Sequence, residues 1–174
     1  MTAGAELVEV VDPTGAVLDT VPRSRMRAEN LRHRAVYVAV RSGAGALLAH
    51  QRAAWKDVWP SRWDLAVGGV LGVGERWRDA AVRELAEEVG VEAKPADLQD
   101  LGPGQFEDGE VRVVGHAYAL THDGPFTFPD GEVQAVRWLP LGDLDAWLSA
   151  RPGLVCPDTI AIVLPYLGSS SALW

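Results

Sequence analysis

Residues 69–91 constrain this chain more than any other stretch, because they join a glycine-rich loop to a strongly acidic helical segment. The periodicity of the segment predicts a helix that begins near Trp77 and stops at Gly90. At 3.6 residues per turn, three carboxylates fall within one arc: Glu84, Glu87 and Glu88. Four apolar residues fall on the opposite side: Val82, Leu85, Ala86 and Val89. One side of the helix therefore requires a core, and the other side concentrates negative charge.

The spacing of these carboxylates is typical of a metal site. Glu84 and Glu88 are four residues apart, where like charges repel by about 0.2–0.5 kcal/mol. A divalent cation would turn that repulsion into coordination. Hard oxygen ligands with no nearby cysteine indicate Mg²⁺, or Mn²⁺, rather than zinc. For an isolated E-x-x-E-E run, a solvated helix face is the simpler interpretation.

Nine positions in this segment match one longer pattern, G-x5-E-x7-R-E-U-x-E-E-x-G-U, in which U is aliphatic. They are Gly69, Glu75, Arg83, Glu84, Leu85, Glu87, Glu88, Gly90 and Val91. The pattern resembles the Nudix box, and every defining position is filled. The resemblance implies an α/β/α sandwich in which the box forms a loop–helix–loop beside a mixed sheet. It also implies a hydrolase that cleaves phosphoanhydride bonds with a divalent metal.

Three positions of the box have a physical role that follows from their residue type. Gly90 suits the left-handed conformation that ends a helix, and Gly69 allows the backbone to approach a ligand closely. Arg83 can pair with Glu87 or with Glu75 and so hold an acid ionised.

The resemblance also implies a set of site residues. The metal ligands are expected to be Glu84, Glu87, Glu88 and the carbonyl of Gly69. The catalytic group is expected to comprise Glu87, Arg83 and Glu75. The general base stays open between a box glutamate and a later acid. The later candidates, each more often a surface carboxylate, are Glu107, Asp108, Glu110 and Glu132.

Residues 52–64 add aromatic and basic candidates before the box. Arg52 and Lys56 stand where a substrate phosphate could be gripped, although both could equally be ordinary surface cations. Three tryptophans recur every four residues: Trp55, Trp59 and Trp63. They could stack a base or close an apolar pocket, but aromatic side chains more often belong to the core.

The bulk properties fit one globular domain in a reducing compartment. The 174 residues suffice for a single core, and no run of 18 apolar residues or secretory signal is present. The single cysteine, Cys156, favours the cytoplasm. A net charge of −8 argues against nucleic-acid and membrane partners, but not against a small phosphorylated substrate. A homodimer is compatible with the family.

The remaining pattern predicts an α+β domain with a mixed sheet between helices. Strands are expected at residues 6–11, 16–20, 34–41, 46–51, 65–70, 111–120 and 132–139, and residues 96–103 are expected to form a loop followed by a strand. Helices are expected from Pro140 and over residues 157–167, the latter kinked by Pro165. We divide the chain into an N-terminal extension with a hairpin and a basic linker (1–32), the Nudix domain (33–168) and a loose tail (169–174).

Residues 33–70 are similar to isopentenyl-diphosphate isomerase and its Nudix relatives. The similarity lies in HRAVYVAV, LLAHQR and K-x-x-W-P-x-x-W-D. The isomerases carry a Cys and a metal-binding His where this chain has Gly68 and Val70, and Cys156 is far away in sequence. His33 matches another isomerase histidine, and without its partner a structural role is the expectation.

Three functions therefore remain open. The resemblance favours a Nudix hydrolase acting on a phosphoanhydride, with a nucleoside diphosphate derivative as substrate. A diphosphate isomerase is disfavoured by the missing Cys and His. A non-catalytic nucleotide-sensing domain is disfavoured because no box glutamate is lost.

Overall fold

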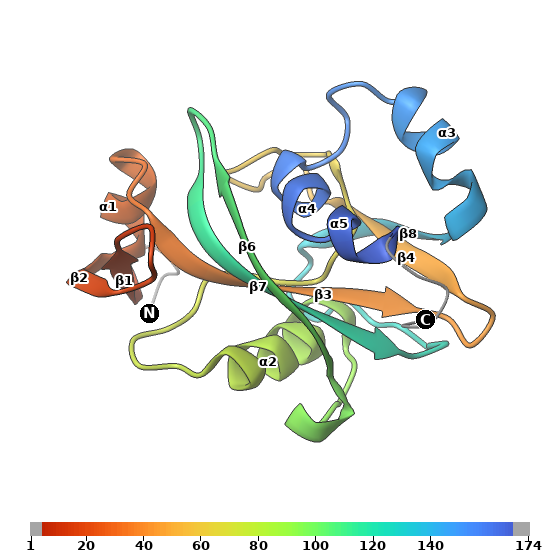
Figure 1. Cartoon of the computed structure of the whole chain (residues 1–174), viewed down its shortest axis with the longest axis horizontal. Helices are drawn as coiled ribbons and strands as arrows, with labels where there is room; N and C mark the ends of the chain where they lie inside the picture. The colour runs from red at the N-terminus through yellow and green to blue at the C-terminus, as the bar shows by residue number, and fades with distance from the viewer. Residues whose placement is uncertain (1–4, 169–174) are drawn as a thin grey trace.

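The computed structural model describes residues 5–168, so the predicted tail at 169–174 lies outside the described residues. Within that range the strands form one eight-stranded mixed sheet (Figure 1). The strands are β1 (Leu7–Val11), β2 (Val17–Pro22), β3 (His33–Arg41), β4 (Ala46–Arg52), β5 (Trp63–Asp64), β6 (Gln99–Glu107), β7 (Arg112–Thr121) and β8 (Val133–Pro140). The α-helices are α1 (Arg23–Ala28), α2 (Trp77–Val89), α3 (Leu144–Ser149), α4 (Pro157–Ile162) and α5 (Leu164–Leu167).

Strand β3 is the centre of the sheet. It runs parallel to β7 along its whole length, from His33 opposite Val113 to Arg41 opposite Thr121. All other pairings are antiparallel: β1 with β2 and β3, β4 with β3, β5 and β8, and β6 with β7. The sheet is therefore mixed, as predicted.

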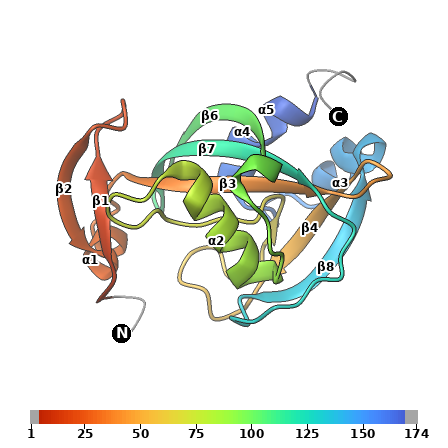
Figure 2. The same ribbon diagram turned by 90° about the horizontal axis from the view of Figure 1, so that it is seen from below.

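Helices cover both faces of this sheet, because β3 is apolar on both sides. Val36, Val38 and Val40 pack with the buried residues of α2. The alternate residues, including Tyr37 and Ala39, pack with α3, α4 and α5. Figures 1 and 2 show α2 on one face and α4 and α5 on the other. This confirms the predicted α/β/α sandwich.

Helix α2 begins and ends as the sequence predicts. It starts at Trp77, and Gly90 caps its C-terminus in the left-handed conformation with φ of 67°. The Val91 N–H donates to the Leu85 carbonyl at 3.0 Å and closes the last turn. The helix that carries the acidic residues therefore has a fixed end against the sheet.

One predicted element differs in the structure, and the break predicted in the last helix is confirmed. Residues 65–70 form no regular strand, because only Val67 and Val70 make isolated bridges to β3 before the chain turns toward α2. The last helix is divided at Val163 into α4 and α5, which confirms the kink expected from Pro165.

The N-terminal extension packs directly on the loop of the box. Val8, Val21 and Met26 form a small core with Val70. Val8 also bridges to Gly72. Figure 2 shows β1, β2 and α1 gathered at one end of the sheet, beside the loop that leads to α2. Among the described residues, no helix is both long and apolar enough to cross a bilayer.

We expect Leu85→Ala to lower the free energy of unfolding by about 2–5 kcal/mol. Leu85 is fully buried between α2 and the sheet, so truncation leaves a cavity in the core. Urea denaturation would measure the change. Val73→Ala, at a half-exposed position, is the matched control and should change stability by less than about 0.5 kcal/mol. Equal effects of the two substitutions would contradict this packing of α2.

Candidate functional site

Arg83 contacts three of the acids of the site. Its guanidinium donates to both carboxylate oxygens of Glu75, at 2.9 and 3.0 Å. It also donates to Glu84 at 2.7 Å and to Glu87 at 3.0 Å. The predicted pairing with Glu75 or Glu87 is therefore realised with both, and Glu84 is added. These acids, Glu75 first, hold the pKa of Arg83 above its usual value.

Glu75 is fixed in its ionised form at the entrance to the helix. Burial would raise the pKa of its carboxyl, but the Arg83 guanidinium and the Gly72 N–H outweigh burial and hold that pKa below its usual value. The Gly72 N–H donates to Glu75 at 2.8 Å. Glu75 therefore tethers the loop before α2 to Arg83.

Glu84 and Glu88 are buried beneath the sheet, whereas Glu87 is exposed. Burial raises the pKa of Glu84 to about 7, against the opposing charge of Arg83. Burial, followed by the charge of Glu84, raises the pKa of Glu88 well above its usual value. The helix side that we expected to carry only charge therefore faces inward, and Val82 and Ala86 are only partly buried. Two acids in the interior are costly unless a cation compensates them.

The glycines before α2 make room for these acids. A Cβ added at Gly69 would collide with the carboxylate of Glu84. The Gly69 carbonyl, a predicted metal ligand, accepts the N–H of Val36 at 3.0 Å. It retains a second lone pair, so this hydrogen bond leaves the proposed ligand role possible.

Glu88 meets His50 of β4 in the interior. His50 Nε2 lies 3.9 Å from Glu88 Oε2. Within the described part of the chain, neither Glu88 Oε2 nor His50 Nδ1 has a hydrogen-bond partner. Burial lowers the pKa of His50, which favours its neutral form. A buried carboxylate oxygen without a donor is the kind of group that a bound cation satisfies.

The donor set fits a divalent cation of the Mg²⁺ class, because it consists of carboxylates and backbone carbonyls. Across residues 5–168, no three Asp, Glu, His or Cys side chains converge at the spacing of a metal site. Arg83 contacts one oxygen of Glu84 and one of Glu87, so the second oxygen of each carboxylate is not held by Arg83.

A cavity of about 330 Å³ adjoins these acids. Glu84, Glu87 and Glu88 line one side of it, and Gly68 and Gly69 line another. A group of residues from outside the box completes the wall: Glu6, Arg23, Lys56, Asp130 and Glu132. The structure therefore places a cation, Lys56, and two later acids across from the box.

The comparison with known proteins decides the family. The domain model described as NUDIX domain matches residues 31–155. The chain belongs to the Nudix hydrolase family. The uncharacterized Nudix hydrolase YfcD of Escherichia coli (strain K12) is 35% identical over 158 residues, which cover 91% of this chain and 84% of that protein. An uncharacterized Nudix hydrolase of Streptomyces coelicolor is 40% identical over 151 residues, covering 85% and 82%.

Solved structures show the same Nudix fold. The crystal structure of DR0079 from Deinococcus radiodurans aligns with a TM-score of 0.70 at 25% identity, covering 83% of this chain and 90% of that one. MutT protein from Methanosarcina mazei aligns with a TM-score of 0.63 at 18% identity, covering 78% and 90%.

The two cations predicted outside the Nudix box lie close to it, but both already have partners. Arg52 pairs with Asp64 at 3.5 Å and donates to the Val58 carbonyl at 3.2 Å. Lys56 forms an ion pair with Glu132. Of the candidate bases, Glu132 lines the acidic cavity. Asp108 lies on the β6–β7 turn, where its Oδ1 accepts the N–H groups of Glu110 and Val111 at 2.7 Å.

Glu107 is also held on that turn, by arginines. It pairs with Arg32 at 2.6 Å and with Arg112 at 2.8 Å. Glu107, Asp108 and Glu110 are all absent from the lining of the acidic cavity. The later candidate that the structure brings to the box is therefore Glu132.

The three tryptophans occupy different environments. Trp59 is buried edge-on against Phe106, and Trp63 packs edge-on against Trp147 of α3. Trp55 is exposed and lies beside Lys56. Trp59 and Trp63 thus pack in the core, and Trp55 is the exposed one of the three.

His33 makes a hydrogen bond to the backbone, which fits the structural role expected for it. Its Nδ1–H donates to the Leu31 carbonyl at 3.0 Å, since a carbonyl can only accept. Burial lowers the pKa of His33 to about 4, so its ring is neutral at pH 7.

A buried polar cluster lies below Arg52, and it was not predicted from the sequence. Tyr37 donates to Asp158 at 2.9 Å. The Cys156 thiol is fully buried against Asp64, and burial raises its pKa far above the usual value. Cys156 lies outside the cavity linings and does not replace the isomerase cysteine. Burial, then the charge of Asp64, raises the pKa of Asp158 to about 7.

Asp158 should make the protein less stable as the pH rises. Its carboxyl has a pKa of about 7 in the fold against 3.8 for the free side chain, so the folded state binds the extra proton between these values. The free energy of unfolding should therefore fall from about pH 4 to about pH 7 and stay low above that. We expect Asp158→Asn to flatten this slope in urea denaturation, and exposed Asp145→Asn to leave it unchanged. Parallel profiles for Asp158→Asn and wild type would contradict the assignment.

Proposed function

We propose that this Nudix protein hydrolyses a phosphoanhydride bond in a nucleoside diphosphate derivative, and that it requires Mg²⁺ or Mn²⁺. The burial of Glu84 and Glu88 is the observation that carries this proposal. Both acids have raised pKa values, and Glu88 Oε2 has no protein donor among the described residues. A helix face built only for stability would not keep two such acids in the interior.

Glu84, Glu88 and the Gly69 carbonyl are the proposed ligands, with Glu87 joining them from the rim of the cavity. A divalent cation held there would neutralise the phosphoanhydride oxygens and make phosphorus more electrophilic. Arg83 keeps the acids oriented, since it reaches Glu75, Glu84 and Glu87 at once. Glu75 in turn fixes Arg83 through two hydrogen bonds.

The reaction itself is a displacement at phosphorus by water. The oxygen of water forms a bond to phosphorus, the bridging P–O bond breaks, and the leaving phosphate takes the electron pair. A carboxylate accepts the proton of water. We assign that role to Glu87, whose side chain is 53% exposed and borders the cavity, with Glu132 as the alternative on the opposite wall.

Lys56 and Arg52 are the proposed phosphate-binding cations. Lys56 lines the acidic cavity, and its ammonium group is held by Glu132. Arg52 lies deeper, against Asp64. Both are fixed by acids of the protein, so each is already oriented before substrate arrives.

The isomerase alternative is disfavoured by the backbone around Gly68. A Cβ at this position would collide with the Val36 carbonyl oxygen, so a cysteine would require the backbone to move. Val70, at the histidine position, is buried with the extension. The similarity to an isomerase-like branch therefore rests on residues 33–70 alone. A sensing domain keeps the same cavity but would bind nucleotide without turning it over.

Glu88→Gln tests the hydrolase directly. We expect kcat/KM with Mg²⁺ to fall by at least about 100-fold, because loss of even an outer-shell partner of a metal site costs about 10–100-fold. Phosphate release from nucleoside diphosphates, nucleoside triphosphates and nucleotide sugars is the measurement, and EDTA should abolish it. Glu92→Gln, an exposed acid just beyond α2, is the matched control and should retain activity.

Two results would contradict the proposal. Activity that persists in folded Glu88→Gln would remove this residue from the site. Tight nucleotide binding without turnover of any compound, with and without metal, would instead support the sensing domain.

A further inference from the structure

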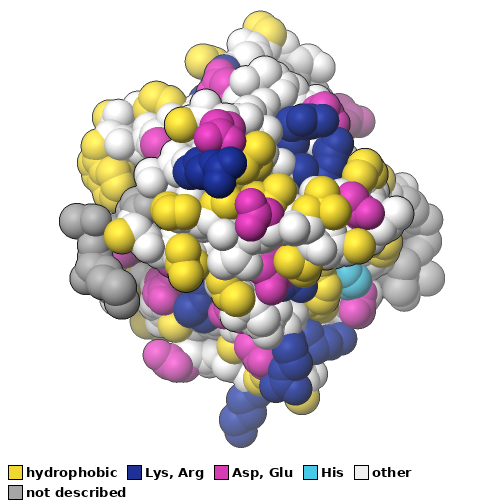
Figure 3. Space-filling model, turned by 90° about the vertical axis from the view of Figure 1, so that its left-hand side faces the viewer, with side chains coloured by type: hydrophobic (Ala, Val, Ile, Leu, Met, Phe, Trp, Pro, Cys, Tyr) yellow, Lys and Arg dark blue, Asp and Glu magenta, His cyan; other side chains and the backbone are white. Residues whose placement is uncertain are grey.

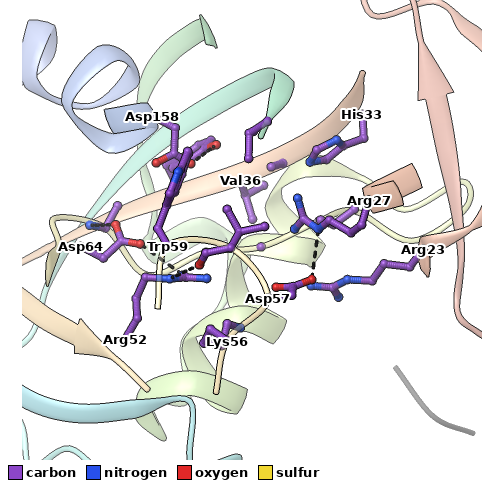
Figure 4. Close-up of a pocket in the computed structure, with 18 residues that line it drawn as sticks. Arg23, Arg27, His33, Val36, Arg52, Lys56, Asp57, Trp59, Asp64 and Asp158 are labelled. Atoms are coloured by element: carbon purple, nitrogen blue, oxygen red, sulfur yellow. Dashed lines mark hydrogen bonds and ion pairs between the residues drawn. The ribbon is translucent and has the colours of Figure 1, made fainter. Parts of the chain in front are cut away.

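A second, narrower cavity of about 70 Å³ adjoins the acidic cavity, and Figure 4 shows its lining residues. Arg23, Lys56, Gly68 and Gly69 line both cavities, so the two are neighbours across the loop before α2. A pocket that buries a drug-sized ligand has about 300–1,000 Å³. The narrow cavity therefore suits a compact group, such as one phosphate, and excludes a nucleobase.

Four cations line this narrow cavity, and they come from two separate segments. Arg52 ends β4 and Lys56 follows it, whereas Arg23 and Arg27 belong to α1 of the N-terminal extension. Figure 4 shows Arg23 and Arg27 pointing into the cavity from the side opposite Arg52. The face that carries β1, β2 and α1 displays several clusters of Lys and Arg side chains (Figure 3).

The two arginines of α1 are less completely paired than Arg52 and Lys56. Arg27 reaches Asp57 only at 3.4 Å, and Asp57 is itself half-exposed. The atom of Arg27 in this ion pair is its buried Nε, which makes no hydrogen bond within residues 5–168. Among residues 5–168, Arg23 pairs with Glu6 alone, also at 3.4 Å. Since a guanidinium has five N–H donors, most of the binding capacity of Arg27 is unused.

The acids of the cavity do not cancel these cations. Asp57 is the partner of Arg27, and Asp64 is the partner of Arg52. Asp158 lies at the far end, where Tyr37 donates to it. His33 contributes no positive charge at neutral pH, as described above. Four cations against three acids leave the lining of the narrow cavity with a net positive charge.

From this arrangement we infer that Arg23 and Arg27 form a subsite for the terminal phosphate of the substrate. The inference rests on the proposed hydrolase for the identity of the ligand. A phosphate placed there would lie beside the box glutamates, with the rest of the substrate in the wider cavity. The favoured substrates are then diphosphates or triphosphates esterified at one end only. Nucleotide sugars and dinucleotides, esterified at both ends, lack the free phosphate that this subsite holds.

A binding measurement separates this subsite from catalysis. Calorimetry with inorganic pyrophosphate, in EDTA, would use wild type, Arg27→Gln, Arg27→Lys and Arg25→Gln. Arg25 is the matched control on the same helix, because it is half-exposed and paired with Glu29. We expect Arg27→Gln to weaken pyrophosphate binding at least about tenfold, in line with a charged hydrogen bond. Arg27→Lys should retain part of the affinity, and Arg25→Gln should retain all of it.

Steady-state kinetics provide the second measurement. With a nucleoside triphosphate, Arg27→Gln should raise KM at least about tenfold and leave kcat within a factor of about three. With a nucleotide sugar, KM should be unchanged. If Arg27→Gln destabilises the fold in a thermal melt, Arg23→Gln, at a more accessible position, replaces it.

Pyrophosphate affinity that is equal in Arg27→Gln, Arg23→Gln and wild type would overturn the subsite. So would equal increases in KM for both substrate types. If no compound is hydrolysed but pyrophosphate binding still depends on Arg27, the hydrolase fails and the phosphate subsite stands.

Discussion

The burial of two like-charged acids on one helix is the constraint on which this structure depends. Glu84 and Glu88 lie against the sheet, where a low dielectric opposes their ionisation. The rest of α2 is arranged to hold them there: Leu85 and Val89 fix the helix on the sheet, and Gly90 ends it. Arg83 supplies one positive charge, which it shares among Glu75, Glu84 and Glu87. Within residues 5–168, Glu88 Oε2 has no hydrogen-bond donor, so its charge is left uncompensated there.

The sequence predicts most of this architecture because local signals and core packing agree. The apolar run of β3, the apolar positions of α2 and the capping Gly90 each predict an element. The strand expected at residues 65–70 was wrong, since this stretch bends along β3 to carry the glycines under Glu84. A run of apolar residues does not reveal such a bend.

The site was predicted less completely than the fold. The box residues follow from their spacing, but the inward tilt of Glu84 and Glu88 depends on how α2 packs, which periodicity alone does not fix. His50 was missed because its contact with Glu88 joins two distant segments. Its position two residues after the buried Leu48 on β4 was the available signal, as both face α2. Arg23 and Arg27 were missed for the same reason, because the extension reaches the cavity only in three dimensions.

The most direct test of this account is the effect of Mg²⁺ on the melting temperature of wild type and Glu88→Gln at pH 8. Without metal, the variant should melt higher than wild type, because it removes a buried negative charge. Adding Mg²⁺ should raise the melting temperature of wild type and leave that of the variant nearly unchanged, because only wild type gains a ligand bound to its folded state. Equal responses of the two proteins to Mg²⁺, with the metal-free variant melting lower than wild type, would contradict the claim that Glu88 is kept buried for a cation.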